Sequence, residues 1–335
     1  MQYSLTEHIT EHDWRDFILN HPLGNIFQTP EIYKVYTKTK NYKPILLGVS
    51  SEKKSIVGVL LAVIQAEHSG FLGKLSKRSI IIGGPIVKDN DPDILDLLLK
   101  AYQKIIKGKA IYTQVRNLFD QKSLQNYYEL NGFKYEAHLD ILINLDVSKG
   151  ELLKGIKREK SRNLTKSLNK GIAFKEIQTR DELQEGYKLL YSTYRRLKLP
   201  LPDYSLFINA FNILQYSGYI KIFGAYSKAR IIGVRLVLNY KDKIYDWFAG
   251  SDENSRNQYP NDFLIINTLM WGIKNKYTEF DFGGAGKPEV PYGVRDHKIK
   301  FGGKLVEFGR FEKVHNPILM KLGILGFHIY KILKF

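Results

Sequence analysis

The residues with the clearest chemical potential lie near the carboxyl end of the chain. Residues 279–282 alternate acidic and aromatic side chains, which is the period of a β-strand. After Asp281 the strand runs into glycines at positions 283, 284 and 286, which predict an open and permissive loop. The loop then carries four basic residues, namely Arg295, His297, Lys298 and Lys300. Charged groups held just past a strand end on a glycine-rich loop are a common way to build a site.

These side chains suit different parts of a reaction. His297 belongs to the residue type that changes charge near neutral pH, and it could act as a base. Asp281 could receive or orient an attacking ammonium, although carboxylates at strand ends often only pair with a nearby lysine. Arg295 and Lys300 are candidate substrate-binding residues. The segment 301–303 is expected to close the loop before a second strand over residues 304–310.

The elements that must position this cluster follow an α/β order. In the first half, strands are predicted at 45–49, 56–64, 81–87 and 110–115, with a strand or hairpin at 133–145 and helices at 93–106 and 124–130. In the second half, helices at 183–197 and 263–274 flank a strand at 245–252. We therefore predict an α/β (α+β) fold.

The two halves of the chain resemble each other. Segments 45–61 and 221–236 both read as a strand, a basic turn and a strand. Gly48 matches Gly224 at an offset of 176 residues, which is too long for a solenoid repeat and fits a duplicated domain. A length of 335 residues also favours two domains. We expect a first domain over residues 1–146 and a second over residues 147–335.

Composition limits the classes of function. The chain has no cysteine, which excludes disulfides, thiolate zinc sites and cysteine nucleophiles. A formal net charge of +17 favours polyanionic partners, although well-solvated lysines would give the same number. The amino-terminal residues lack the apolar core of a signal peptide, and no apolar run approaches the roughly 20 residues that span a bilayer. We therefore expect a cytoplasmic protein.

A basic segment over residues 149–170 joins the two halves. Eight lysines and arginines stand there against two glutamates, and Arg158 and Arg162 are candidate phosphate-binding residues. A solvated helix would show the same pattern, and both interpretations stay open. Arg196, at the end of the predicted helix 183–197, could grip a phosphate or carboxylate, or simply cap that helix.

Several motifs carry a resemblance to a known family. An Asp-Phe-Gly-Gly strand end at 281–284, followed at 297–303 by a segment resembling aromatic-Lys-x-x-Phe-Gly-Gly, is similar to the FemABX family. Phe27, Gln28 and Thr29 resemble the family's amino-terminal segment, in which Thr29 is a plausible helix N-cap. His297 departs from the pattern, because it replaces the usual aromatic residue. The segment 149–171 resembles the family's basic helix.

The resemblance implies a fold and an activity. FemABX enzymes have two tandem acetyltransferase-like (GNAT) domains and transfer amino acids from aminoacyl-tRNA to the stem peptide of lipid- or UDP-linked peptidoglycan precursors. By resemblance, Lys298 would steady the oxyanion of acyl transfer or the tRNA terminus. Gln28 would belong to the substrate-binding residues. No cofactor is implied, because aminoacyl-tRNA or acyl-CoA would be a co-substrate.

The donor and the activity have alternatives. GNAT enzymes that use CoA cradle its pyrophosphate with a glycine-rich turn before a helix. This chain has Arg256 but no glycine between Arg256 and Phe263, which counts against an acyl-CoA donor. An acyl-CoA-dependent N-acyltransferase acting on an amino sugar of a surface polysaccharide stays open. A non-catalytic binder of nucleic acid or membrane also stays open.

Two further patterns lie at the two ends of the sequence. Residues 8–12 match the H-x-x-E-H zinc pattern, but the match is short and lies at the extreme amino terminus, so we expect an exposed helix start and no metal site. Residues 317–335 are amphipathic and could lie on an anionic membrane, as a peripheral contact at its inner face. A helix packed on the second domain would show the same pattern.

Overall fold

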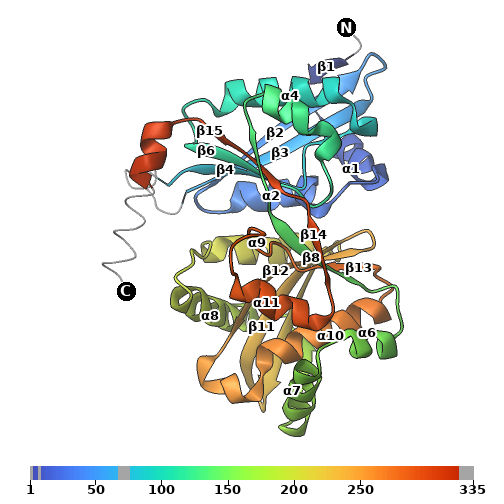
Figure 1. Cartoon of the computed structure of the whole chain (residues 1–335), viewed down its shortest axis with the longest axis vertical. Helices are drawn as coiled ribbons and strands as arrows, with labels where there is room; N and C mark the ends of the chain where they lie inside the picture. Colours follow the sequence, from blue (N-terminus) through green and yellow to red (C-terminus); the bar gives the residue numbers. More distant parts are fainter. Residues whose placement is uncertain (1–2, 7–8, 67–75, 324–335) are drawn as a thin grey trace. The chain divides into compact units, whose positions relative to one another are not determined.

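The computed structural model describes residues 3–6, 9–66 and 76–323, which form two compact units (Figure 1). The first unit contains residues 1–137 together with 308–335, and the second contains residues 138–307. Each unit is built around one mixed β-sheet with helices on its faces. The α/β (α+β) class that the sequence predicts is confirmed.

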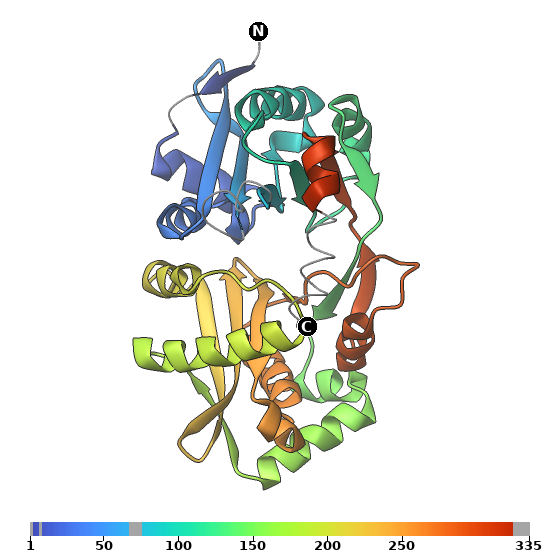
Figure 2. The same cartoon turned by 90° about the vertical axis from the view of Figure 1, so that its left-hand side faces the viewer.

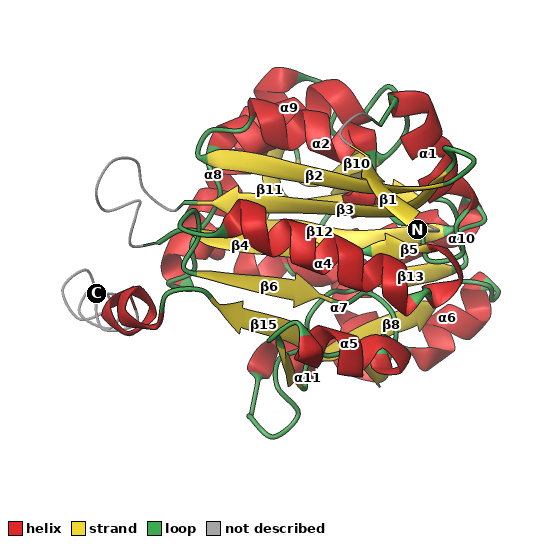
Figure 3. Cartoon of the chain, turned by 90° about the horizontal axis from the view of Figure 1, so that it is seen from above, coloured by secondary structure: helices red, strands yellow, loops and turns green. Residues whose placement is uncertain are grey.

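The first unit holds a sheet with the strand order β1-β2-β3-β4-β6-β15-β7, in which β5 pairs with β3. Helix α4 packs on β2 and β3 and buries the leucines at 95, 98 and 99, as their helical spacing predicts (Figure 3). Helix α2 begins after Thr29, whose side chain accepts a hydrogen bond from the backbone of Ile32, so the predicted N-cap is confirmed. The strands are β1 (Tyr3–Thr6), β2 (Tyr42–Ser51), β3 (Ile56–Gln65), β4 (Arg78–Ile82), β5 (Ile86–Val87), β6 (Tyr112–Arg116), β7 (Lys134–Glu136) and β15 (Arg310–Val314), and the α-helices are α1 (Glu11–Asn20), α2 (Pro30–Lys38), α4 (Pro92–Ile106) and α5 (Gln125–Leu130).

The second unit holds a sheet with the strand order β14-β8-β13-β12-β11-β10-β9. Within this sheet β12 and β13 run parallel, and α10 connects them. Helices α8 and α10 both pack on β11 and β12, and Figure 2 shows α8 crossing the near side of the sheet. The strands are β8 (Leu139–Asn144), β9 (Ile172–Glu176), β10 (Ile220–Ser227), β11 (Arg230–Tyr240), β12 (Lys243–Ser251), β13 (Glu279–Asp281) and β14 (Lys304–Glu307), and the α-helices are α6 (Lys149–Gly155), α7 (Arg158–Asn169), α8 (Arg180–Arg196), α9 (Tyr204–Leu214), α10 (Pro260–Lys274) and α11 (Gly293–Lys298).

The two units do not follow the expected division at residue 146. Strand β8, expected in the first domain, lies between β13 and β14 in the sheet of the second unit. Strand β15, expected in the second domain, lies between β6 and β7 in the sheet of the first unit. The predicted strand or hairpin at 133–145 is therefore two strands in different sheets. Pairing with distant strand edges decides this exchange, and local sequence does not encode such pairing.

The segment that follows β13 also differs from the sequence-based expectation. The basic cluster lies on α11 and on a following 3-10 turn (Ile299–Phe301) instead of an open loop. Buried Phe301 anchors this turn in the core of the second unit. The strand expected over 304–310 is interrupted at Gly309, whose φ of 67° turns the chain between β14 and β15.

Two expectations fall partly outside the described residues. Residues 317–323 are helical, but residues 324–335 of the amphipathic tail are not described. Among the described residues, no helix combines the length and apolarity that crossing a membrane requires. His8 of the H-x-x-E-H pattern is not described, and no group of three or more potential metal-ligating side chains occurs in the remaining described chain.

Candidate functional site

The centre of the candidate site is Lys298, at the end of β13. Its ammonium lies 2.6 Å from the carbonyl oxygen of Phe282 and donates more weakly to those of Gly283 and Gly284, at 3.3 and 3.2 Å. The same ammonium lies 5.7 Å from the centre of the Phe282 ring. Burial lowers the pKa of Lys298, and the carboxylates of Asp246, Asp140 and Asp281 oppose this shift. The residue predicted as catalytic therefore stands at the end of α11 and contacts the turn that ends β13 through its ammonium.

Asp281 belongs to a pair of buried carboxyl groups. It is 3% exposed, and it hydrogen-bonds to the carboxyl of Asp140, which is 6% exposed. Burial and the charge of Asp140 raise the pKa of Asp281 well above its usual range, so Asp281 keeps its proton to a higher pH than an exposed carboxyl group does. An oxygen of Asp281 also accepts a hydrogen bond from the backbone N–H of Gly283 at 2.6 Å. This pair stabilises the glycine turn, and an amine could contact Asp281 only after a rearrangement.

His297 is half-buried, and both of its ring nitrogens face other side chains. Its Nδ1 lies 3.3 Å from the ammonium of Lys160, and its Nε2 lies 3.3 Å from Nδ2 of Asn261 and 3.6 Å from Oδ1 of Asp262. Burial, reinforced by the charge of Lys160, lowers the pKa of His297 to about 4. The imidazole is therefore neutral at neutral pH. Because both ring nitrogens already face protein groups, the expected role of His297 as a base would require one of them to be released.

Lys160 is a member of the site that the sequence analysis did not identify. Its ammonium contacts both carboxylate oxygens of Asp262, at 3.1 and 2.9 Å, and Asn163 donates to the same carboxylate at 2.7 Å. These contacts tie α7 to the first turn of α10. Lys160, Leu164 and Ser167 recur at helical spacing on the inner face of α7, and this periodicity was the signal that could have separated Lys160 from its exposed neighbours.

A buried arginine extends the same network. Arg235 on β11 is 3% exposed; it donates to the carboxylate of Asp246 on β12 and, at 3.0 Å, to the side-chain oxygen of Asn261 on α10. Asn261 in turn faces His297. Polar contacts therefore run continuously from β12 through α10 to α11 and α7. Arg235 interrupts a long apolar strand, and an isolated charge in such a strand was the sequence signal for it.

The remaining predicted residues of the second unit differ in their surroundings. Arg295 donates to the carbonyls of Lys287 and Val290, both at 2.8 Å, and so holds the loop before α11. Lys300 lies 3.1 Å from the carboxylate of Glu159 on α7. Arg196 lies 3.6 Å from Glu253, and Arg256 is exposed on the 3-10 turn Glu253–Gln258.

Arg158 and Arg162 lie on the exposed side of α7. Together with Lys166 and Lys170 they recur at every fourth residue, which makes a row of basic side chains along the helix. Neither arginine has a hydrogen-bond or ion-pair partner within the described part of the chain. The row begins beside Lys300, because the backbone N–H of Lys157 donates to the carbonyl of Lys300 at 2.9 Å.

Gln28 lies in the first unit, where it is fully buried. Its amide donates to the carbonyls of Leu61 and Ile82, at 3.1 and 2.8 Å, and its oxygen accepts from the backbone N–H of Leu61 at 2.8 Å. These three bonds join the 3-10 turn before α2 (Ile26–Gln28) to the sheet. The structure therefore gives Gln28 a structural role within the first unit.

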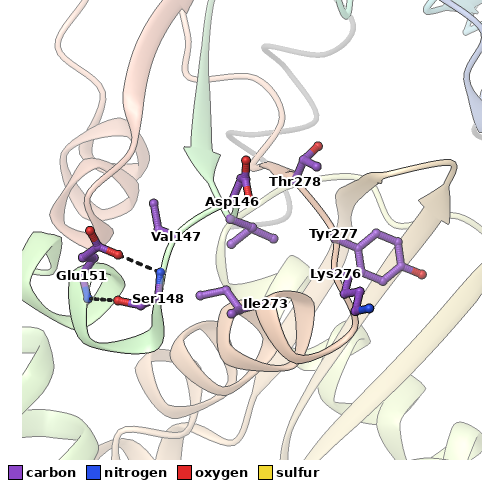
Figure 4. A pocket seen from close by; sticks show the side chains of 9 residues that line it. Asp146, Val147, Ser148, Glu151, Ile273, Lys276, Tyr277 and Thr278 are labelled. Atoms are coloured by element: carbon purple, nitrogen blue, oxygen red, sulfur yellow. Dashed lines mark hydrogen bonds between the residues drawn. The ribbon is translucent and has the colours of Figure 1, made fainter.

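A cavity of about 540 Å³ lies elsewhere in the second unit (Figure 4). It is lined by the residues that follow β8, the start of α6, the end of α10 and the residues just before β13. Its polar groups Ser148 and Glu151 form the capping box of α6 and so already bond to each other's backbone. None of the predicted site residues lines this cavity, and it faces the end of β13 opposite to Lys298.

Comparisons with known proteins show which folds this chain resembles. Residues 154–298, from α6 to Lys298, match a family model described as an acetyltransferase (GNAT) domain. The structure of FemX aligns with a TM-score of 0.72 at 16% identity, over 96% of this chain and 99% of FemX. L-PGS from Bacillus licheniformis aligns with a TM-score of 0.57 at 15% identity, over 88% of this chain and 90% of L-PGS. A tandem GNAT protein of the clavulanic acid pathway aligns with a TM-score of 0.58 at 9% identity, over 94% of this chain and 99% of that protein. No curated protein sequence matches the chain. The predicted fold of two tandem GNAT-like domains is confirmed.

Proposed function

We propose that this protein transfers an aminoacyl group from aminoacyl-tRNA to an amine of a lipid- or UDP-linked peptidoglycan precursor. The observation that carries the proposal is Lys298, whose ammonium lies at the carbonyls that end β13 in a chain with the fold of FemX. The FemABX-like motif over residues 281–303 supports the same assignment. The coarser activity is acyl transfer to an amine, for which the GNAT fold is well suited.

The reaction requires stabilisation of one negative charge. The amine nitrogen attacks the ester carbonyl, a C–N bond forms, and the ester C–O bond breaks as the 3′-oxygen of the tRNA leaves with a proton from the amine. The carbonyl oxygen carries the charge of the intermediate. The ammonium of Lys298 can turn from the carbonyl of Gly283 or Gly284 to that oxygen, since both of these hydrogen bonds are long.

The first turn of α10 opposes a CoA donor. Asp262 places a buried carboxylate at the helix start where a CoA-binding GNAT cradles pyrophosphate, and Lys160 and Asn163 hold it there. A pyrophosphate at this position would meet that negative charge. The residue before the helix, Tyr259, has a φ of 54° in place of a permissive glycine.

The basic row on α7 supports an RNA donor. Like charges four residues apart destabilise a helix by about 0.2–0.5 kcal/mol per pair, so helix stability does not account for the row of Arg158, Arg162, Lys166 and Lys170. An extended polyanion neutralises such a row along its whole length. The row starts beside Lys300, two residues from Lys298, which is where the acceptor end of a tRNA would arrive.

Acyl transfer from acyl-CoA to an amino sugar of a surface polysaccharide is the second candidate. The match of residues 154–298 to a model described as an acetyltransferase domain favours it. The membrane location implied by a lipid-linked acceptor stays a prediction, as does peripheral binding through the carboxyl-terminal tail.

A donor test separates the two candidates. The protein would be incubated with radiolabelled aminoacyl-tRNAs, and separately with acetyl-CoA, each with lipid- and UDP-linked precursors. Label that moves from tRNA to a precursor, is lost in Lys298→Ala and persists in Lys304→Ala supports the proposal. Lys304 is a suitable control because it is an exposed lysine of the neighbouring strand β14. Label that moves only from acetyl-CoA would replace the proposal with the second candidate.

A further inference from the structure

The burial of Lys160 calls for an explanation. The basic segment 149–170 contains eight lysines and arginines, of which seven are exposed and Lys160 alone is buried, at 5% exposure. A lysine loses its hydration when buried and is tolerated there only with partners that accept its protons. The ammonium of Lys160 contacts the carboxylate of Asp262 and the imidazole of His297. It also lies over the ring of Phe301, 5.5 Å from the ring centre. Each of these groups lies on α10, on α11 or just after it.

We propose that Lys160 is a positioning residue for the reaction: paired with Asp262, it holds His297 as a neutral imidazole and so fixes α11, on which Lys298 stands. Its effect on catalysis rests on the proposed function. Its effect on the protonation of His297 does not, and it can be measured without a substrate.

The hydrogen-bond donors around His297 disfavour its doubly protonated form. An ammonium has only donors, so its contact with Nδ1 of His297 is a hydrogen bond only when Nδ1 carries no proton. On the other side, Arg235 donates to the oxygen of Asn261 and thereby turns the amide nitrogen of Asn261 toward Nε2. The imidazole thus has a donor on each side. A neutral ring with its proton on Nε2 places an N–H group against the amide alone, with Oδ1 of Asp262 3.6 Å away, whereas a doubly protonated ring would place an N–H group against the ammonium of Lys160 as well.

The surrounding charges act in the same direction. Lys160, Arg235 and Lys300 disfavour a proton on His297, whereas Asp262 favours one. Lys160 is the charge with the largest effect, after burial itself. The charged groups near His297 are Glu159 and Lys160 on α7, Asp262 on α10, Arg235 on β11, Lys300 on the turn after α11, and Arg295, Asp296 and Lys298 on its own segment.

Tertiary contacts must hold α11, because a helix of six residues has little stability alone. The ring of His297 packs edge-on against Phe301 with centres 5.3 Å apart, and the same Phe301 lies under Lys160. Lys298 is the next residue after His297. A charge on His297 would repel Lys160 and add a second cation next to Lys298, which would move the ammonium that the reaction uses.

The first experiment is a titration of His297 by NMR in the wild-type protein and in Lys160→Met. Methionine keeps most of the length of lysine and removes the charge, so Asp262 becomes the dominant charge on the ring. We expect a ring that stays neutral down to about pH 5 in the wild type, and one whose pKa rises from about 4 toward its ordinary value of about 6.5 in the variant. Lys154→Met, which removes an exposed charge from α6, should titrate like the wild type.

Two further variants separate an effect of the Lys160 charge from an effect of misfolding. Asp262→Asn breaks the same ion pair but leaves the cation, so it should not raise the pKa of His297, whereas Lys160→Met should raise it. Lys160→Arg keeps the charge and should also keep the ring neutral. If Lys160→Met does not fold, the wild-type titration decides: a ring that titrates near about pH 6.5 overturns the proposal, and a neutral ring that is unprotonated at Nδ1 supports it.

A second experiment measures kcat for aminoacyl transfer as a function of pH. In Lys160→Met, kcat should fall about tenfold for each pH unit below the new pKa of His297, a dependence absent from the wild type. The double variant Lys160→Met/His297→Asn should lose this new dependence. Equal titration curves in the wild type and Lys160→Met would overturn the proposal, even if transfer from aminoacyl-tRNA is confirmed. If no transfer is found, the proposed function fails and the titration still tests Lys160.

Discussion

The ammonium of Lys298 lies 2.6 Å from the carbonyl oxygen of Phe282, at the point where β13 ends and the glycine turn begins. One residue of α11 thus closes the turn and presents its charge at the end of the strand. A substrate oxygen that bonds to Lys298 would exchange with one of the longer carbonyl contacts, at 3.2 and 3.3 Å. The cation therefore needs little movement between its resting and its working position.

Replacement of Lys298 tests this arrangement. Lys298→Ala should lower kcat by about 10²–10³-fold, which is the usual effect of losing one donor to an oxyanion. Lys298→Arg should retain part of the activity, because it keeps the charge but changes the geometry. Single-turnover transfer from aminoacyl-tRNA measures both. An activity of Lys298→Ala close to that of Lys304→Ala would show that the ammonium has no role in the transition state.

The carboxyl pair of Asp281 and Asp140 predicts a dependence of stability on pH. The pKa of Asp281 is raised in the folded protein, so the folded state binds more protons than the unfolded state above about pH 4, the ordinary pKa of the group. Stability should therefore fall as pH rises from about 4 through the folded pKa, by about 1.4 kcal/mol for each unit of the shift. Urea denaturation at several pH values measures this dependence.

Asp281→Asn is the matched variant for this prediction. The amide cannot ionise, yet its oxygen can still accept from Gly283 and its nitrogen can donate to Asp140. The free energy of unfolding of Asp281→Asn should fall less between about pH 5 and 8 than that of the wild type. Parallel curves for the two proteins would mean that Asp281 ionises in the folded state as it does in the unfolded chain.

The basic row on α7 predicts how the protein binds RNA. Replacing both Arg158 and Arg162 by glutamine should weaken binding of a tRNA acceptor stem at low salt. It should also reduce the slope of log K against log salt by about 0.9 for each lost phosphate contact. Arg180→Gln/Lys188→Gln removes two exposed charges from α8 and is the matched control. If both double variants bind RNA equally, the row on α7 is a solvated surface.

Two glycines near α11 should respond differently to alanine. Gly302 has a φ of 91°, and a Cβ there would meet the carbonyl oxygen of Gly155 at 2.9 Å. Gly302→Ala should destabilise the protein by about 1–2 kcal/mol or more, because it combines left-handed backbone strain with a backbone contact. Gly293→Ala places its Cβ in open space at the start of α11 and should be tolerated. Chemical denaturation of both variants measures the difference.

Local sequence determined the elements that depend on short-range chemistry. The N-cap of α2 at Thr29, the leucine face of α4 and the end of β13 in a glycine turn all follow from residues within a few positions of one another. Within the site, residue type predicted a basic cluster after β13, and the resemblance of residues 281–303 to the FemABX motif is what pointed to Lys298. The sequence also predicted the α+β class and the internal duplication, because periodicity and turn chemistry are local.

Tertiary structure decided which distant groups meet. The exchange of β8 and β15 between the two units depends on strand edges far apart in the chain, and no local pattern records a pairing partner. The burial of Lys160 depends equally on Asp262, which is 102 residues away. From the sequence alone, a lysine in a basic helix is predicted to lie at the surface. In the folded unit, a carboxylate and an imidazole on other elements surround Lys160. Burial, and with it the protonation of His297, is a property of the packed unit, because desolvation and neighbouring charge exist only after folding.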